Sequence, residues 1–266
     1  MEAHIDNVQI NYDDTGSGPA VILLHEFPLN RNMWRPQTQE LVNNGFRVIA
    51  PDLRGFGRTP SHGKPFSIAT HSQDVITLMN YLGIGRAVVV AAATAGRILI
   101  DLNRRFAHRL SASCFIGQAF NVDDSVHTAV KATLESGKYD LAMEMLGDQF
   151  LPEHRCLHTQ QRAHDVNKWI KSAEHDALLG WLRSTEEAQL EINPDIKLRH
   201  ALLLTGDAPS QQSALHISTN IATEVVAGAG RLLNLDKSGV VNQSLLDFLG
   251  WLNATRVKQP DRAVAA

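Results

Sequence analysis

Cysteine is scarce in this sequence: Cys114 and Cys156 are the two thiols among 266 residues. Two thiols cannot build the disulfide framework that stabilises small secreted domains, and Cys114, inside an apolar run, is expected to be a buried and inert thiol. No apolar run approaches the roughly 18 residues that a membrane-spanning helix needs. Residues 1–6 lack the basic and apolar pattern of an export signal. The sequence therefore predicts a cytoplasmic protein without a membrane anchor.

An excess of positive charge is also absent. The chain carries 25 Lys and Arg against 28 Asp and Glu, a formal net charge of -3. This balance argues against nucleic acid or an anionic membrane surface as a partner. The length and the 44% hydrophobic content suit a globular protein with a sizeable core. We expect a small-molecule substrate or ligand as the partner, and a homodimer is left open.

Signals for a metal or a nucleotide cofactor are weak. Among the 12 histidines, His154 and His158 lie four residues apart, but Pro152 and a helix start beside them argue against a shared ligand face. Gly228-Ala229-Gly230 lacks the strand-to-helix setting of a dinucleotide-binding turn. The sequence predicts no metal and no cofactor.

Buried strands alternate with amphipathic helices in most of the chain. An alternating edge strand is expected over 8–12. Continuous apolar runs that are typical of strands buried on both faces stand at 20–24, 46–50, 87–90, 111–116, 200–206 and 224–227. Helical spacing stands between them at 34–44, 71–82, 96–106 and 240–252. This order predicts an α/β fold with a mostly parallel sheet flanked by helices, and it places ligands at the carboxyl ends of the strands.

The alternation stops over residues 118–194, where no buried-strand pattern occurs. Helical periodicity recurs there at 125–134, 139–150, 158–172 and 177–190. We interpret this stretch as a helical domain inserted over the sheet. The predicted division is a core domain of residues 1–117 and 195–266 and an inserted domain of residues 118–194. The polar tail from Asn253 to Ala266 is expected to fray.

The stretch from Val88 to Leu99 organises the rest of the chain. A β-branched strand passes through small residues into a helix, which is the setting of a nucleophile elbow, where Ser, Cys or Asp stands on a tight strand-to-helix turn. Small Ala91 and Ala95 flank the turn, as close crossing of strand and helix requires. The nucleophile position itself holds Ala93, whose methyl group cannot attack a carbonyl.

These segments resemble the α/β-hydrolase superfamily, and the likeness covers nearly the whole chain. Residues 21–34 resemble the family's first core strand and oxyanion loop, 51–58 its Pro-Asp-x-Arg-Gly-x-Gly segment, and 88–99 its elbow. The resemblance implies the α/β-hydrolase fold, and it implies that the inserted helices form the cap that roofs the active site.

The catalytic residues of that family do not carry over to this sequence. The nucleophile position holds Ala93, the acid position aligns with Pro209, and the position of the catalytic His aligns with Arg231. An alternative acid position at the end of strand 113–116 holds Gly117, and Asp207 stands two residues from the usual acid. The resemblance therefore predicts a pseudo-hydrolase with a degenerate catalytic triad.

Several groups around the expected oxyanion site could still take part in catalysis. By resemblance, the backbone N–H groups of Phe27 and Thr94 are its donors. Glu26 stands where the family commonly has Gly, and a partly desolvated carboxylate there could serve as a general acid or base. The alternative is a carboxylate that is solvated or paired with an arginine, and Arg31 and Arg54 are the expected partners. We expect His25 to pack structurally at the start of this loop.

Charged residues of the loops and residues of the inserted region are further candidates, and structural roles are expected for most of them. We expect Asp52 and Arg54 to hold the loops together through hydrogen bonds. In the inserted region, Asp123, Asp124, His127, Trp169 and Trp181 could face the pocket, although charged residues of that kind are usually solvated and such aromatics usually belong to the core.

Three functions are compatible with this pattern. The first is a non-hydrolytic, cofactor-independent enzyme, a lyase, isomerase or cyclase acting on a fairly apolar metabolite or biosynthetic intermediate, with Glu26 as its acid or base. The second is a catalytically dead homologue that binds a ligand or a partner protein. The third is a hydrolase with an unusual constellation, such as a water activated by Glu26. The sequence favours the first narrowly over the second.

Overall fold

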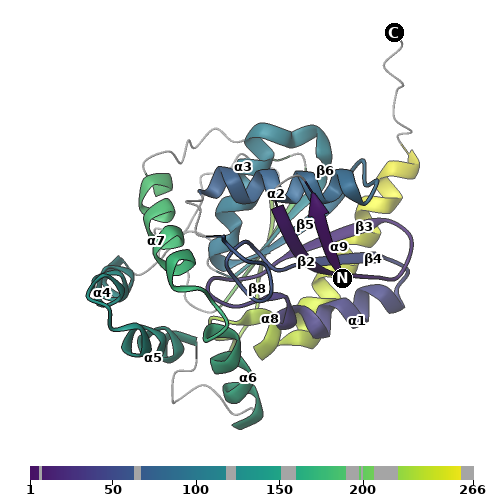
Figure 1. Cartoon of the computed structure of the whole chain (residues 1–266). Helices are drawn as coiled ribbons and strands as arrows, with labels where there is room; N and C mark the ends of the chain where they lie inside the picture. Colours follow the sequence, from purple (N-terminus) through teal and green to yellow (C-terminus); the bar gives the residue numbers. More distant parts are fainter. Residues whose placement is uncertain are drawn as a thin grey trace.

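The computed structural model describes residues 1–5, 8–62, 67–117, 124–150, 160–189, 198, 200–206 and 221–258. Within these residues, an eight-stranded sheet lies at the centre of the molecule with helices on both faces (Figure 1). The strands are β1 (Glu2–Ile5), β2 (Val8–Thr15), β3 (Ala20–Leu24), β4 (Arg47–Pro51), β5 (Ala87–Ala92), β6 (Leu110–Ile116), β7 (Ala201–Thr205) and β8 (Ile221–Val225).

Helices cover both faces of this sheet. The α-helices are α1 (Arg35–Asn43), α2 (Ile68–Tyr81), α3 (Gly96–Phe106), α4 (Asp124–Glu135), α5 (Tyr139–Phe150), α6 (Gln160–Ile170), α7 (His175–Gln189), α8 (Leu233–Asp236) and α9 (Ser238–Lys258). Short 3₁₀ helices are η1 (Arg31–Trp34), η2 (Ala93–Ala95) and η3 (Ala107–Arg109). Helix α2 packs against α3, and α1 packs against α8 and α9.

The strand order is β1-β2-β4-β3-β5-β6-β7-β8. The six strands β3 to β8 pair in parallel, while β1 and β2 add an antiparallel pair at one edge. The predicted mostly parallel sheet flanked by helices is therefore confirmed. Because β3, β5 and β6 are neighbours, the loops at their carboxyl ends meet at one edge of the sheet.

The centre of the sheet is its most apolar part. Every residue of β5 and β6 is buried, as expected for strands covered by helices on both faces. Cys114 of β6 is fully buried, and burial raises the pKa of its thiol. The expectation of an inert thiol agrees with this environment.

Helices α4 to α7 follow one another between β6 and β7. Helix α4 packs against α5 and α7, α5 packs against α6, and α7 reaches α2 beside the sheet (Figure 1). Their approach to the loop after β4 is close: a Cβ added to Gly55 would lie 2.1 Å from the Cβ of Ala177. The domain division at residues 118 and 194 stays a prediction.

The structure differs from the prediction near both ends of the chain. Strand β1 was not predicted, and β2 continues to Thr15, beyond the predicted end at Tyr12. Helix α9 continues to Lys258, so the expectation of fraying from Asn253 is wrong for its first residues. Leu252 is buried against the core and anchors this end of the helix. Polar residues on the solvent side continue a helix that is already anchored.

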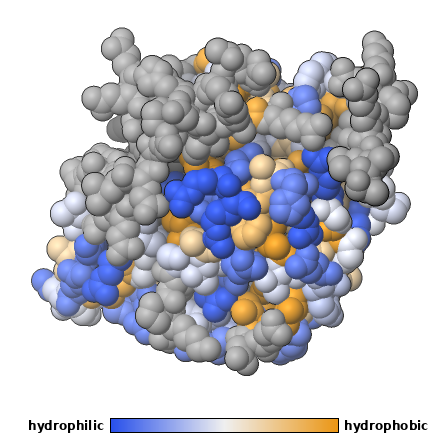
Figure 2. All heavy atoms as spheres, turned by 90° about the horizontal axis from the view of Figure 1, so that it is seen from above, coloured by the Kyte–Doolittle hydropathy of each residue, from blue (hydrophilic) through white to orange (hydrophobic). Residues whose placement is uncertain are grey.

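No helix in the described part of the chain is long and apolar enough to cross a membrane. On the face shown in Figure 2, strongly hydrophilic residues lie between the hydrophobic ones.

Candidate functional site

The elbow between β5 and α3 has the backbone of a nucleophile turn. Ala93 adopts a positive φ of 37°, which non-glycine residues rarely do. A Cβ added to Gly117, after β6, would lie 3.7 Å from the Cβ of Ala93 and 3.6 Å from the carbonyl oxygen of Arg231. Ala93, Gly117 and Arg231 therefore converge, as the positions of a nucleophile, an acid and a base would. None of the three supplies a nucleophile or an unprotonated base.

The two backbone N–H groups that the resemblance assigns to an oxyanion site are engaged by the protein's own side chains. The N–H of Thr94 donates to Oε2 of Glu26 at 3.0 Å. The N–H of Phe27 points to Oγ1 of Thr94 at 3.4 Å. Both backbone donors that the resemblance assigns to this site therefore have acceptors on the protein's own side chains. A substrate oxyanion would have to displace Glu26 to reach the N–H of Thr94.

Glu26 forms a buried ion pair with Arg231. Nη2 of Arg231 lies 3.1 Å from Oε1 of Glu26, whose side chain is fully buried, while Arg231 is 26% exposed. The partners considered from the sequence were wrong, because Arg31 pairs with Asp52 and Arg54 pairs with Asp74. Pairing with an arginine occurs, but the arginine comes from a position 205 residues further along the chain.

Burial dominates the electrostatics of Glu26. It raises the pKa of this carboxyl above its ordinary value, and the positive charge and hydrogen bond of Arg231 and the hydrogen bond from Thr94 lower it again in part. A raised carboxyl pKa is a property that general acids and bases share. In this conformation, however, both carboxylate oxygens are engaged and the side chain has no exposed surface.

Arg231 also joins the core to the helical layer. Its Nη1 donates to Oε1 of Gln149 at 3.0 Å, and its guanidinium carbon lies 4.8 Å from the ring centroid of Phe150, both on α5. A cation over an aromatic face at this distance is attracted by the ring. One side chain therefore contacts Glu26 in the core and two residues of α5.

Aromatic rings close the site from the other side. Trp181 of α7 is fully buried and stacks on Phe27, with centroids 5.6 Å apart and planes 5° apart. Phe56 meets Trp181 edge-on at 6.1 Å, and His127 of α4 lies 6.1 Å from Phe27. Of the candidate residues of the inserted region, His127 and Trp181 thus lie against the oxyanion loop. Trp169 is partly buried against the core.

His25 holds the oxyanion loop. Its Nε2 accepts from the N–H of Leu53 at 2.8 Å, which leaves Nδ1 as the donor to the carbonyl of Glu26 at 3.0 Å. Burial lowers the pKa of this imidazole, so the neutral form fits the hydrogen bonds. The loop that carries Glu26 is therefore fixed to the segment after β4.

Asp52 and Arg54 act within the same loops. Asp52 accepts from the backbone N–H groups of Arg31 and Arg58, each at 2.9 Å. Arg54 binds both carboxylate oxygens of Asp74 at 2.9 and 2.7 Å. These contacts are the loop-holding hydrogen bonds expected from the sequence.

Several predicted positions lie outside the described residues: Asp123, His154, Cys156, His158, Asp207 and Pro209. Asp124 begins α4, and its side chain is not among those described. Within the described part of the chain, no group of three or more His, Cys, Asp or Glu side chains could hold a metal ion.

The Glu26–Arg231 pair was missed by sequence reasoning, although the sequence held a signal for it. Both residues stand where the resembling family has other types, Gly at one position and His at the other. Two charges of opposite sign at positions that converge in that fold are candidates for pairing. Gln149 carried no comparable signal.

Comparisons with known proteins agree with the fold. Residues 19–169 match the model of the family described as alpha/beta hydrolase fold. The bifunctional epoxide hydrolase 2 of Sus scrofa is 31% identical over 115 residues, 42% of this chain and 21% of that protein. The non-heme haloperoxidase of Rhodococcus erythropolis is 33% identical over 113 residues, 42% of this chain and 41% of that protein.

Among solved structures, a thermophilic esterase from Thermogutta terrifontis superimposes with a TM-score of 0.82 at 22% identity, covering 95% of this chain and 98% of that one. Likeness at this identity concerns the fold. The sequence matches span less than half the length of the two relatives named above.

Proposed function

Since this chain belongs to the alpha/beta hydrolase fold family, we propose that it is a catalytically silent member that binds a ligand or partner and hydrolyses neither esters nor epoxides. The observation that carries this proposal is the Glu26 carboxylate bound to the N–H of Thr94 and to Arg231. An acyl-transfer site needs that N–H group for the substrate oxyanion.

The loss of covalent chemistry supports the same function. Ala93 offers no attacking atom, and a guanidinium such as that of Arg231 does not serve as a general base in place of a histidine. The hydroxyl of Thr94 lies 3.4 Å from the backbone nitrogen of Phe27, beyond the elbow apex, and it hydrogen-bonds to the Glu26 carboxyl, which Arg231 also binds. The elbow position itself therefore offers no starting group for hydrolysis through an acyl or alkyl enzyme.

A second candidate function rests on a specific observation, the raised pKa of Glu26. A carboxyl group with a raised pKa can exchange a proton with a substrate without a covalent intermediate. This would make the protein a lyase, isomerase or cyclase of a small metabolite. It requires the ion pair with Arg231 to open, because both oxygens of Glu26 are engaged.

The first experiment separates these candidates. The purified protein is assayed with p-nitrophenyl butyrate and styrene oxide and then incubated with a cell extract, with mass and retention time followed by chromatography. Silence toward both substrates and retention of a compound with unchanged mass and retention time support the proposal. Turnover of either activated substrate contradicts it.

Glu26→Gln is the discriminating variant for the extract experiment. If a compound is converted by the wild type and is bound but not converted by this variant, Glu26 transfers a proton and the second candidate is correct. Asp74→Asn is a matched control, because Asp74 is also a carboxylate paired with an arginine, but it lies away from the elbow in the pair with Arg54. Loss of conversion in both variants points to a general loss of structure.

A further inference from the structure

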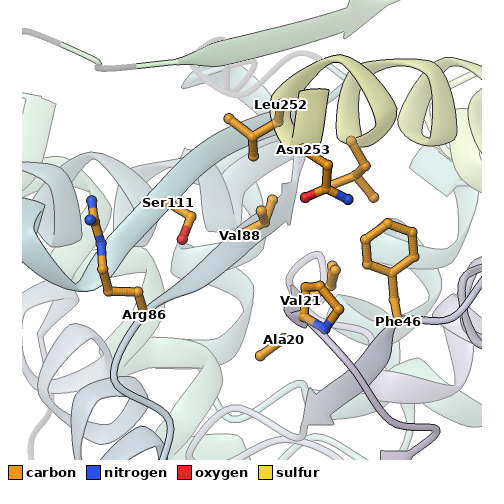
Figure 3. Close-up of a pocket in the computed structure, with 10 residues that line it drawn as sticks. Ala20, Val21, Phe46, Arg86, Val88, Ser111, Leu252 and Asn253 are labelled. Carbon is orange, nitrogen blue, oxygen red and sulfur yellow. The ribbon is translucent and has the colours of Figure 1, made fainter. Parts of the chain in front are cut away.

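A cavity lies at the edge of the sheet opposite to the former active site. It has a volume of about 240 Å³ and is bounded by the beginnings of β3, β5 and β6 and by the end of α9 (Figure 3). The residues that line it are Pro19, Ala20, Val21, Phe46, Arg86, Val88, Ser111, Leu249, Leu252 and Asn253. Pro19 and Asn253 are exposed, so the cavity opens to solvent.

This cavity is separate from the candidate site described above. Ala20, Val88 and Ser111 stand at the amino ends of parallel strands, whereas Glu26, Ala93 and Gly117 follow their carboxyl ends. Five residues of extended strand separate Val88 from Ala93, roughly 16 Å. A ligand in this cavity would not contact the elbow.

The lining combines an apolar wall with donors on one side. Phe46, Val88 and the leucines of α9 form the apolar part. Arg86 and Ser111 lie together on the other side of Val88 from Asn253 and Phe46 (Figure 3). Among the ten lining residues, Arg86 carries the single charge, and there is no acidic side chain.

The guanidinium of Arg86 is held in place at the wall of the cavity. The Nη2 of Arg86 donates to the carbonyl of Leu110 at 3.0 Å, which fixes the guanidinium at the start of β6. Its Nε is buried and has no hydrogen-bond partner within the described residues. Ser111, which also lines the cavity, is 5% exposed. A guanidinium held in place at the wall of an open cavity can pair with an anionic ligand through charge-assisted hydrogen bonds.

We propose that this cavity binds a small monocarboxylate with a compact aliphatic or aromatic body. The carboxylate would accept from Arg86 and from the hydroxyl of Ser111, while the body would lie against Val88, Phe46 and Leu252. A volume just below the usual range of about 300–1,000 Å³ for ligand sites restricts the occupant to a small molecule. This inference goes beyond the proposed function and stands separately from it.

The test uses the full-length protein with hexanoate and benzoate as probes and their neutral amides, hexanamide and benzamide, as controls. Binding is followed by calorimetry and by ligand-observed NMR. We expect the acids to bind and the amides to bind at least about tenfold more weakly, because charge-assisted hydrogen bonds are about twice as strong as neutral ones. Arg86→Gln should weaken the acids to the level of the amides.

Two further variants locate the site. Arg105→Gln is the matched control, because it removes one positive charge from an exposed pair with Asp101 and should leave binding unchanged. Ala20→Phe places a ring in the cavity and should abolish binding, with its circular dichroism and melting temperature measured to show that the variant is folded.

Three outcomes would overturn the inference. The acids do not bind; the acids and amides bind equally and Arg86→Gln has no effect; or binding is lost in Trp181→Phe and kept in Ala20→Phe. The last result would place the ligand at the former active site, and it would leave the proposed binding function standing.

Discussion

Replacing Arg231 by methionine should destabilise the protein through the charge that it leaves behind. Glu26 is fully buried, and Arg231 is its one cationic partner within the described residues. Removing one member of a buried ion pair costs about 3–5 kcal/mol. Because Arg231 is 26% exposed, solvent screening places this pair at the lower end, about 3 kcal/mol. For a chain of this size, we expect a fall in melting temperature of roughly 6–12 °C.

The loss should depend on pH with a defined sign. Burial already raises the pKa of Glu26 in the folded state, and without Arg231 it rises further. The folded variant then holds a proton that the unfolded chain releases at its ordinary value of 4.5. The free energy of unfolding therefore falls as pH rises from about 4.5 to the raised folded pKa, and it is constant above that value. The deficit against the wild type should be larger at pH 8 than at pH 5.

Chemical denaturation at both pH values measures the loss of stability, and two further variants are measured for comparison. Gln149→Met removes the other hydrogen bond of Arg231 and leaves Glu26 paired, so it should cost about 1 kcal/mol at either pH. Glu26→Gln combined with Arg231→Met buries no charge and should recover most of the loss. If Arg231→Met costs less than about 1 kcal/mol, or costs the same in the Glu26→Gln background, the two residues are not coupled and the reasoning is wrong.

Three other predictions follow from the site and its surroundings. Ala93→Ser should show no esterase activity with p-nitrophenyl butyrate, because Arg231 cannot accept the proton of the serine; a clear gain would contradict the triad assignment. Trp181→Ala should cost about 3–5 kcal/mol in chemical denaturation, since a fully buried ring stacked on Phe27 is lost, and a cost below about 1 kcal/mol would refute this packing. His71 is buried, and burial lowers its pKa to about 3, so its NMR chemical shifts should stay constant from pH 8 to pH 5. In the unfolded chain, the same histidine gains a proton near pH 6.5, so the free energy of unfolding should fall as pH falls below that value. This part of the pH dependence should be absent in His71→Phe.

The sheet could be predicted from the sequence because its strands are continuous apolar runs. Residues 20–24 and 87–90 form short apolar runs that contain β-branched residues, a combination typical of strands buried on both faces, and nearly all of these residues are buried in β3 and β5. The edge was harder to predict: β1 contains only four residues, and its antiparallel pairing with β2, from Glu2 opposite Asn11 to Ile5 opposite Val8, is local in sequence and depends on backbone hydrogen bonds rather than on a hydrophobic pattern. Helix α9 similarly continues past its last predicted apolar position because the buried part holds it.

One part of the candidate site could be predicted from the sequence and another part could not. The elbow was predictable because a β-branched strand followed by small residues leaves the backbone few alternatives, and Ala93 indeed has the positive φ of such a turn. The hydrogen bonds of Glu26 were not predictable, because they join three segments that are distant in the sequence. Position 26 meets positions 94 and 231 only after β3 and β5 have paired and the loop after β8 has returned to the same edge.

The changes at this edge depend on one another physically. A carboxylate at position 26 without a cation would be a buried unpaired charge, and Arg231 without Glu26 would lose its acidic partner in the core. A serine at position 93 would regain an attacking atom, but the N–H of Thr94 would remain occupied by Glu26. Under the proposed function, we therefore expect no single substitution at positions 26, 93 or 231 to produce hydrolysis, and we expect the loss of either charge alone to cost stability. The interactions that would keep such a site silent are the same ones that hold its loops together.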